Sequence, residues 1–271
     1  MKCLICKADM IYAFSKKYDS DPYKNMMKEI GKVEYFRCIN CGLTISKTHS
    51  ELKKEIWERL NYDFHHYLEN NGTDINQPPY QEQALMLKIL SENGIIDAKN
   101  IIDYAGGYGS LSKVIKKYFD IDLPIYDPYV QSGSNKYVQK KDLVKYKTVL
   151  NSALFEHLLA RKSFDEINSL VSECGGALLI HTRICENVPN DPDWFYLNPP
   201  VHTTFHTNKS MDLLMKQWGY VESIYCLPAR SWVLLKENDL NIEKRVNLIN
   251  SELQTEYLVY KSGFVDYWKG S

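Results

Sequence analysis

Four of the seven cysteines form two closely spaced pairs near the start of the chain. Two residues separate Cys3 from Cys6 and Cys38 from Cys41, and 31 residues lie between the pairs. This spacing is typical of a tetrahedral zinc site, because each short turn can aim two thiolates at one ion about 2.3 Å away. Four thiolates leave no open position, so we expect a structural Zn²⁺ ion, with the apolar stretch at residues 33–36 as a strand of a small zinc ribbon. The alternatives are incidental buried cysteines or a redox pair.

A second motif that could bind a ligand begins in the apolar stretch at residues 101–104. Asp103 lies at its end, and the turn at residues 105–109, with the sequence Ala-Gly-Gly-Tyr-Gly, leads into a helical pattern. Small residues let a ligand approach the backbone at the carboxyl edge of a parallel sheet, where nucleotide-like ligands bind. The turn has neither the Gly-Lys-Ser/Thr ending of a phosphate loop nor the spacing of a dinucleotide fingerprint.

At these residues the sequence resembles the class I S-adenosylmethionine-dependent methyltransferases. Their first motif is an acid, any residue, then Gly-x-Gly-x-Gly, and residues 103–109 match it except that Ala105 replaces the first Gly. Asp127 follows Gly109 by 18 residues, the spacing at which an acid accepts hydrogen bonds from both ribose hydroxyls. Asp142 resembles the acid that takes the adenine amine, and residues 149–158 resemble the fourth strand with its Glu-His-Leu signature.

The resemblance covers residues 80–237 and implies S-adenosylmethionine as cofactor. A second departure from the family pattern is that Tyr146 and Lys147 stand where an acid precedes the fourth strand. The cofactor-binding set that the resemblance implies is Asp103, Ala105, Gly106, Gly107, Gly109, Asp127, Asp142 and Asn151.

Two histidines are candidates for proton transfer. Methyl transfer from a sulfonium needs mainly collinear positioning, but a hydroxyl acceptor must also lose its proton, and histidine suits that task. His202, which like His206 follows the predicted strand at 177–182, is the favoured base, and His157 after the predicted strand at 148–153 is the second candidate. The alternatives are that His202 only bonds backbone or stacks in its loop, and that His157 caps or packs a helix.

Two aromatic groups could border the same site. Tyr62, His65, His66 and Tyr67 lie on one predicted helix and could form a lid over the cofactor, or pack against the zinc module. Residues 193–196, with the sequence Asp-Trp-Phe-Tyr, could form an apolar wall for the acceptor or an ordinary surface cluster.

Apolar runs alternate with helical patterns after residue 80, and this predicts an α/β fold. With the resemblance, we expect a doubly wound, Rossmann-like, mostly parallel seven-stranded sheet whose last strand is antiparallel, plus the small N-terminal zinc ribbon. The predicted strands are 100–104, 121–126, 148–153, 177–182, 220–227 and 231–236, and the predicted helices include 50–68, 111–119, 164–174 and 239–259. The last two strands are joined by three residues, too few for a crossover helix, so they form an antiparallel hairpin.

These patterns divide the chain into four regions. We expect a zinc-binding module at 1–48, a bridging helix and linker at 49–79, a methyltransferase domain at 80–238, and a C-terminal helix and tail at 239–271.

Charge and hydropathy exclude several classes of partner. The formal net charge is −1, so no global positive field would gather nucleic acid or an anionic membrane. No apolar stretch approaches the roughly 20 residues of a membrane span. The first residues lack the apolar core of a signal peptide, so we expect a cytoplasmic protein. Oligomeric state is left open.

A four-cysteine module ahead of such a domain is similar to the arrangement in sugar methyltransferases that act on nucleotide-linked deoxysugars, and more loosely to some ribosomal RNA methyltransferases. Residues 1–70 hold 12 Lys plus Arg against 10 Asp plus Glu, whereas an RNA-docking module should show a basic stripe. We therefore expect a small polar acceptor, a sugar or sugar nucleotide made for surface polysaccharide. The alternatives are RNA methylation, and a non-catalytic scaffold that lost cofactor binding through changes such as Ala105.

Overall fold

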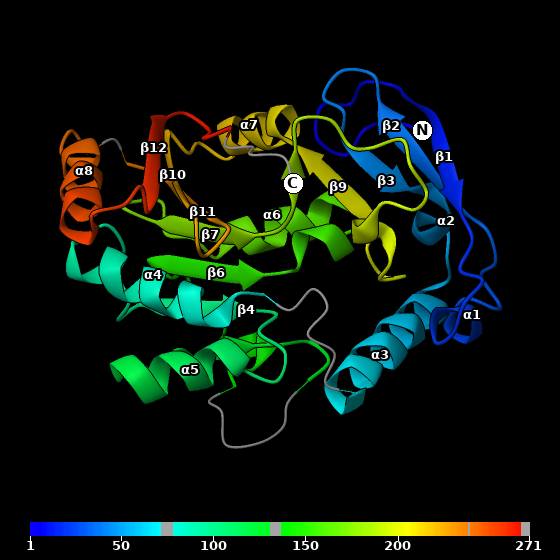
Figure 1. Ribbon diagram of the computed structural model, residues 1–271, viewed down its shortest axis with the longest axis horizontal. Coiled ribbons are helices and arrows are strands. Elements are labelled where there is room, and N and C mark those ends of the chain that lie inside the picture. Colours follow the sequence, from blue (N-terminus) through cyan, green and yellow to red (C-terminus); the bar gives the residue numbers. More distant parts are fainter. Residues whose placement is uncertain (72–77, 131–136, 238, 267–271) are drawn as a thin grey trace. The chain divides into compact units, whose positions relative to one another are not determined.

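The computed structural model describes residues 1–71, 78–130, 137–237 and 239–266, and these form two compact units (Figure 1). Unit 1 consists of residues 1–77, 155–163 and 183–213, and unit 2 of residues 78–154, 164–182 and 214–271. Two segments of the predicted methyltransferase region therefore fold with the N-terminal module. Within the predicted linker and tail, residues 72–77 and 267–271 lie outside the described residues.

Unit 1 is built on a five-stranded sheet in the order β1-β2-β3-β9-β8. Its strands are β1 (Met10–Lys16), β2 (Val33–Cys38), β3 (Thr44–Ser46), β8 (Ile184–Cys185) and β9 (Thr204–Thr207). The first three form an antiparallel ribbon, β9 pairs antiparallel with β3, and β8 pairs parallel with β9. The predicted strand at 33–36 lies within β2, and two later strands extend the ribbon.

Helical segments of unit 1 pack beside this sheet. They are α1 (Tyr23–Met26), α2 (Lys47–Ser50), α3 (Lys54–Asn71), and the 3-10 turns η2 (Phe155–His157) and η3 (Phe195–Leu197). Leu60 and Phe64 of α3 share a buried cluster with Phe14, Tyr35 and Phe205. The predicted bridging helix thus packs its apolar face onto the N-terminal sheet. In the predicted aromatic group of this helix, Tyr62, His65 and His66 are exposed, so the packing alternative does not describe them.

Unit 2 contains a seven-stranded sheet in the order β12-β10-β11-β7-β6-β4-β5. Its strands are β4 (Ile101–Tyr104), β5 (Ile125–Tyr126), β6 (Thr148–Ser152), β7 (Ala177–His181), β10 (Glu222–Cys226), β11 (Ser231–Leu235) and β12 (Leu258–Ser262). Strands β5, β4, β6 and β7 pair in parallel, while β11 pairs antiparallel with β7 and β10. The predicted hairpin and the predicted α/β class are confirmed.

The mostly parallel arrangement is confirmed, because β11 is antiparallel to both β7 and β10, so β10 runs in the same direction as β4, β5, β6 and β7. The prediction of one antiparallel strand was incomplete. The extra antiparallel pairing comes from β12, which joins β10 from a stretch that the sequence assigned to the final helix and tail. Helix α8 (Ile242–Leu253) ends earlier than predicted, at Gln254 with a positive φ of 53°. β5 is the edge strand of this sheet. On its outer side, the described residues form one isolated β-bridge, between Ile125 and Tyr137.

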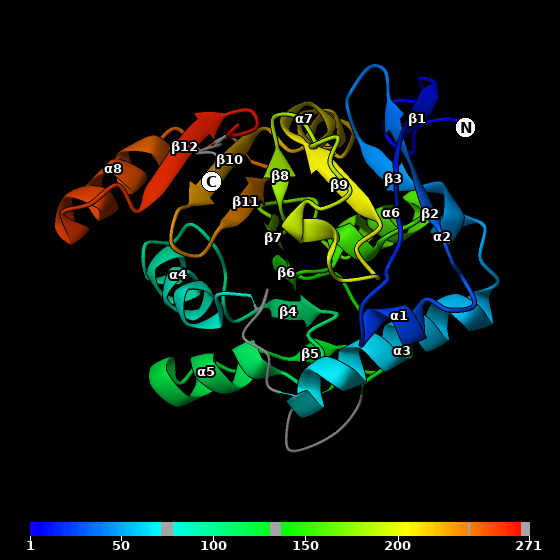
Figure 2. The same ribbon diagram turned by 45° about the vertical axis from the view of Figure 1, so that its right-hand side comes forward.

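The helices of unit 2 cover this sheet with apolar faces. Helix α4 (Tyr80–Glu92) lies beside α5 (Ser110–Phe119), and α8 lies beside β12 (Figures 1 and 2). Leu87 and Leu90 of α4 are fully buried with Leu150, Leu179 and Val233 of the strands. Burying each such side chain contributes about 1.5–3 kcal/mol to the stability of the fold. This core therefore helps to hold the strand β4 in place. The remaining helical segments are η1 (Lys140–Asp142), α6 (Arg161–Ser169) and α7 (Asn208–Gln217).

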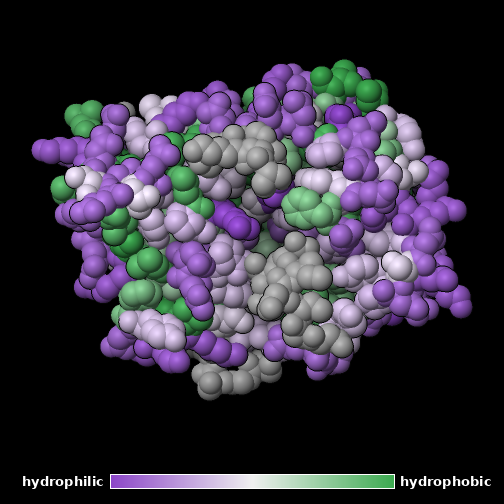
Figure 3. Space-filling model, viewed as in Figure 1, coloured by the Kyte–Doolittle hydropathy of each residue, from purple (hydrophilic) through white to green (hydrophobic). Residues whose placement is uncertain are grey.

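The face seen in Figure 3 is mainly hydrophilic, with hydrophobic residues in small separate groups. Among the described residues, no helix is both long enough and apolar enough to cross a membrane.

Candidate functional site

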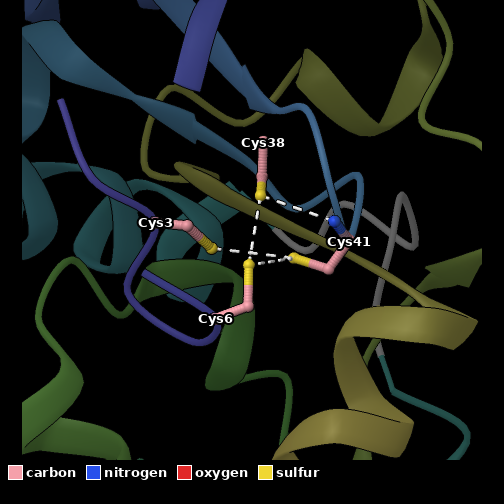
Figure 4. A group of neighbouring side chains, drawn as sticks. All are labelled: Cys3, Cys6, Cys38 and Cys41. Carbon is pink, nitrogen blue, oxygen red and sulfur yellow. Dashed lines mark hydrogen bonds between the residues drawn. The ribbon is translucent and has the colours of Figure 1, made fainter. Parts of the chain in front are cut away.

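The four paired cysteines of unit 1 converge on one point. Their sulfur atoms face one another in Figure 4, with Sγ–Sγ distances of 3.6 Å for Cys3–Cys41, 3.3 Å for Cys6–Cys38 and 3.7 Å for Cys6–Cys41. A tetrahedral ion with Zn–S bonds of about 2.3 Å places its sulfur ligands about 3.8 Å apart. All seven cysteines of the chain are free thiols. The donor set therefore fits one zinc ion with small adjustments.

Local backbone geometry aims these thiols. The amides of Asn40 and Cys41 both donate to Cys38 Sγ at 3.4 Å, and Gly42 turns the chain with a φ of 74°. A Cβ at Gly42 would lie 3.0 Å from Thr207 of β9, whose hydroxyl donates to the Cys41 carbonyl. The hydrogen bond with the Cys41 thiol lowers the pKa of Cys3 to about 5.

The glycine turn of unit 2 connects β4 to α5 as the sequence predicts. Ala105, Gly107 and Gly109 adopt positive φ angles of 63°, 53° and 73°. Ala105 stands where the family motif has Gly, and it adopts the left-handed backbone conformation that Gly adopts readily. For an Ala residue this conformation costs about 1–2 kcal/mol. A Cβ at Gly106 would lie 2.5 Å from an Asp103 oxygen, whereas a Cβ at Gly107 would meet no atom of the described residues within 4 Å.

The two predicted acids lie on either side of this turn. Asp103 is 2% exposed, and its Oδ1 has no hydrogen-bond partner among the described residues. Burial and the negative charge of Asp127 raise the pKa of Asp103 to about 7. Asp127 Oδ2 accepts from the Gly107 amide at 2.9 Å, and its Oδ1 accepts from the Tyr129 and Val130 amides at 2.8 Å. The backbone thus holds Asp127 against the turn.

Of the other two predicted cofactor-binding residues, Asn151 lies on the strand next to β4, and Asp142 lies on the surface. Asn151 is fully buried in β6, the parallel neighbour of β4, and its Oδ1 has no hydrogen-bond partner within the described chain. Asp142 is exposed at the end of η1. Sequence reasoning did not single out Tyr137, whose hydroxyl donates to the Gly107 carbonyl at 2.8 Å. No local pattern marks this contact, because 30 residues separate its partners.

Both predicted catalytic histidines belong to one cluster in unit 1. The rings of His157 and His202 lie 5.2 Å apart at 89°, and His65 of α3 lies 5.5 Å from His157. His202 Nδ1 hydrogen-bonds the Tyr196 carbonyl at 2.8 Å. His202 therefore bonds the backbone through Nδ1, as one of the alternatives predicted. Its second ring nitrogen, Nε2, does not take part in this hydrogen bond.

A carboxylate completes the histidine cluster. Glu156 is 2% exposed and accepts from the Tyr196 hydroxyl at 2.8 Å, while its carbonyl accepts from the Thr203 amide at 2.7 Å. The Glu-His pair was visible in the sequence, but the approach of Glu156 to His202 depends on segments 46 residues apart. Tyr196, from the predicted aromatic wall, orients both groups.

Burial sets the protonation of the histidines. It lowers the pKa of His202 to about 4 and that of His157 well below its ordinary value, with further contributions from neighbouring histidines. Both rings are neutral at pH 7 and can offer a nitrogen lone pair. His206 lies inside β9 and is fully buried, with its pKa lowered to about 3 by burial.

Comparisons with known proteins give distant likenesses. No protein-family model and no curated protein matches the chain. Similar solved structures include an O-methyltransferase family protein from Burkholderia thailandensis (17% identity, 70% of this chain and 61% of that chain, TM-score 0.43). Others are the plantazolicin methyltransferase BpumL in complex with SAH (12%, 73% and 87%, 0.43) and the magnesium protoporphyrin IX methyltransferase ChlM from Synechocystis PCC 6803 with bound SAH (13%, 68% and 98%, 0.41). The chain spans about three-fifths of the length of the first protein.

Proposed function

We propose that this chain is a cytoplasmic S-adenosylmethionine-dependent methyltransferase that modifies a small polar acceptor, a sugar or sugar nucleotide used in surface polysaccharide. One observation carries the proposal: the strand-turn-helix of unit 2 keeps a buried carboxylate oxygen of Asp103 that has no hydrogen-bond partner among the described residues, beside the open space where a Cβ of Gly107 would lie. An unsatisfied buried carboxylate is costly to leave without a ligand. A bound adenosyl group would supply the missing donors.

The residues of the turn suit such a ligand. Open space over Gly107 admits the close approach of a ligand to the backbone. Asp103 and Asn151 each offer a buried acceptor oxygen, and Asp127 keeps further lone pairs for ribose hydroxyls while its amide contacts fix its orientation. When bound, S-adenosylmethionine supplies an electrophilic methyl group.

The histidine cluster supplies the proton acceptor of the proposed reaction. His202 donates from Nδ1 to the Tyr196 carbonyl, which leaves Nε2 as the nitrogen with a lone pair. A neutral imidazole can take the proton of an acceptor hydroxyl as the oxygen becomes a nucleophile. His157 is the second candidate for this role.

The choice of a small acceptor follows from charge. The near balance of 12 basic and 10 acidic residues gives residues 1–70 little net positive charge with which to attract RNA. A reducing compartment suits the seven free thiols.

Calorimetry with S-adenosylhomocysteine tests the cofactor part of the proposal. We expect micromolar binding to the full chain, and absence of binding would leave the non-catalytic scaffold as the better explanation. Incubation with S-adenosylmethionine and a panel of sugar nucleotides should then add one methyl mass to an acceptor. Methylation of total RNA, with binding that weakens as salt is raised, would instead favour the RNA alternative.

The base is tested by His202→Gln, with His66→Gln on the exposed face of α3 as the matched control. Loss of a general base should lower kcat about 10²–10⁴-fold with little change in binding of S-adenosylhomocysteine. An unchanged kcat in His202→Gln would remove His202 from this role.

A further inference from the structure

The histidine cluster has the composition of a second metal site, separate from the four cysteines. One ligand atom each from Glu156, His157 and His202 lies within 4.8 Å of the other two. Glu156 and His202 are 2% and 6% exposed. His157 Nδ1 is buried and has no hydrogen-bond partner among the described residues. An unpartnered imidazole nitrogen beside a buried carboxylate is unfavourable unless something binds between them.

Neighbouring groups orient two of these side chains in the way that metal ligands are usually oriented. The Tyr196 carbonyl accepts from His202 Nδ1, so the Nε2 lone pair is available. The Tyr196 hydroxyl donates to Glu156 Oε1 and thereby fixes the carboxylate. Ligating histidines almost always donate their other ring N–H to a backbone carbonyl or carboxylate, and ligating carboxylates are themselves hydrogen-bonded.

We propose that Glu156, His157 and His202 bind one divalent first-row transition-metal ion, with Zn²⁺ as the probe that tests it. Two imidazole nitrogens and one carboxylate oxygen are the donors that such ions prefer. Zinc held at about 2.0–2.2 Å by these donors brings them to about 3.3 Å from one another, so the ligand atoms need to approach one another by at most about 1.5 Å.

This site differs from the cysteine site in the number of protein ligands. Four thiolates fill a tetrahedral zinc ion, but three ligands leave one position open for water or another oxygen ligand. On the proposed function, and resting on it, the hydroxyl of the acceptor would take that position. His157 and His202 would then serve as ligands and not as the base. The metal would lower the pKa of the hydroxyl, and the hydroxyl proton would pass to water.

Zinc stoichiometry of the full chain tests the site without any measurement of activity. After equilibration with Zn²⁺ against a competing chelator, we expect two tightly bound ions per wild-type chain. His157→Gln and Glu156→Gln should each retain one, and Glu156→Gln keeps an oxygen that can accept from Tyr196. The matched control His66→Gln, exposed on α3, should retain two.

The affinity of the second ion gives a finer test. Tyr196→Phe removes only the hydroxyl that orients Glu156, and we expect about 10–100-fold weaker binding of the second ion. A wild-type chain that binds one ion, or cluster variants that still bind two, would overturn the proposal. Calorimetry with S-adenosylhomocysteine on the same samples reports on the proposed function separately, so the failure of either proposal is recognised by itself.

Discussion

Unit 1 and unit 2 carry their candidate ligand sites on different chemical groups. Unit 1 gathers side chains: four thiols converge at one point, and two imidazoles and a carboxylate at another. Unit 2 instead leaves open space among its described residues where a side chain at Gly107 would lie, and places buried acids beside that turn. A side-chain site loses a ligand with one substitution, whereas a backbone site loses affinity gradually as space is filled. Substitutions in the two units should therefore differ in size of effect.

The largest effect is expected at the cysteine site. Cys41→Ser should cost one zinc ion per chain and destabilise unit 1 by several kcal/mol, because binding energy of a structural zinc is folding energy. Elemental analysis and thermal unfolding measure both. Cys185→Ser is the control, since Cys185 of β8 is as buried as Cys41. Retention of the wild-type zinc content in Cys41→Ser would contradict a four-thiolate site.

The next effect concerns the buried acid of unit 2. The pKa of Asp103 is about 7 in the folded chain against 3.8 for the ordinary group, so the folded state holds a proton that the unfolded state has lost. Stability should therefore fall as pH rises from about 4 to 7, by up to about 4 kcal/mol for a shift of this size. Asp103→Asn cannot titrate and should lack this fall.

Urea unfolding of both proteins between pH 5 and 8 checks this pH dependence. The exposed Asp142→Asn variant is the control and should follow the wild type. Parallel curves for wild type and Asp103→Asn would mean that Asp103 is ionised in the folded chain throughout.

A smaller effect is expected from a methyl group placed on the turn. Gly107→Ala should weaken binding of S-adenosylhomocysteine about tenfold, or about 1.4 kcal/mol, by filling space that the ligand needs. Gly219→Ala is the matched control, because Gly219 also has a positive φ and open space around it. Both variants carry similar backbone strain, so calorimetry isolates the ligand effect. Equal affinities in the two variants would place the ligand elsewhere.

The smallest effect is expected at Tyr137. Tyr137→Phe removes the hydrogen bond to the Gly107 carbonyl, which is worth about 0.5–1.5 kcal/mol. S-adenosylhomocysteine should bind several-fold more weakly, while Tyr118→Phe, at a residue that is 64% exposed, should bind like wild type. An unchanged affinity in Tyr137→Phe would show that this contact does not support the turn.

Features encoded over a few residues could be predicted from the sequence. The convergence of each cysteine pair follows from a spacing of two residues, and the turn after β4 follows from its run of small residues. The positions of β4, β5, β6 and β7 along the chain and the hairpin of β10 and β11 follow from apolar runs and loop lengths. In each case the residues that determine the feature are neighbours in the chain.

Other features depended on the tertiary structure. Strands β8 and β9 extend the N-terminal sheet, β12 pairs with β10, and Glu156 meets His202, although each partner lies far away in the sequence. The sequence pattern of α8 runs on toward β12 without a visible break, so the sequence predicted a longer helix. In the structure the helix ends where Gln254 adopts a positive φ. Such pairings depend on which apolar surfaces pack together and which unpaired backbone N–H and C=O groups hydrogen-bond in the folded chain. No local sequence pattern carries that information.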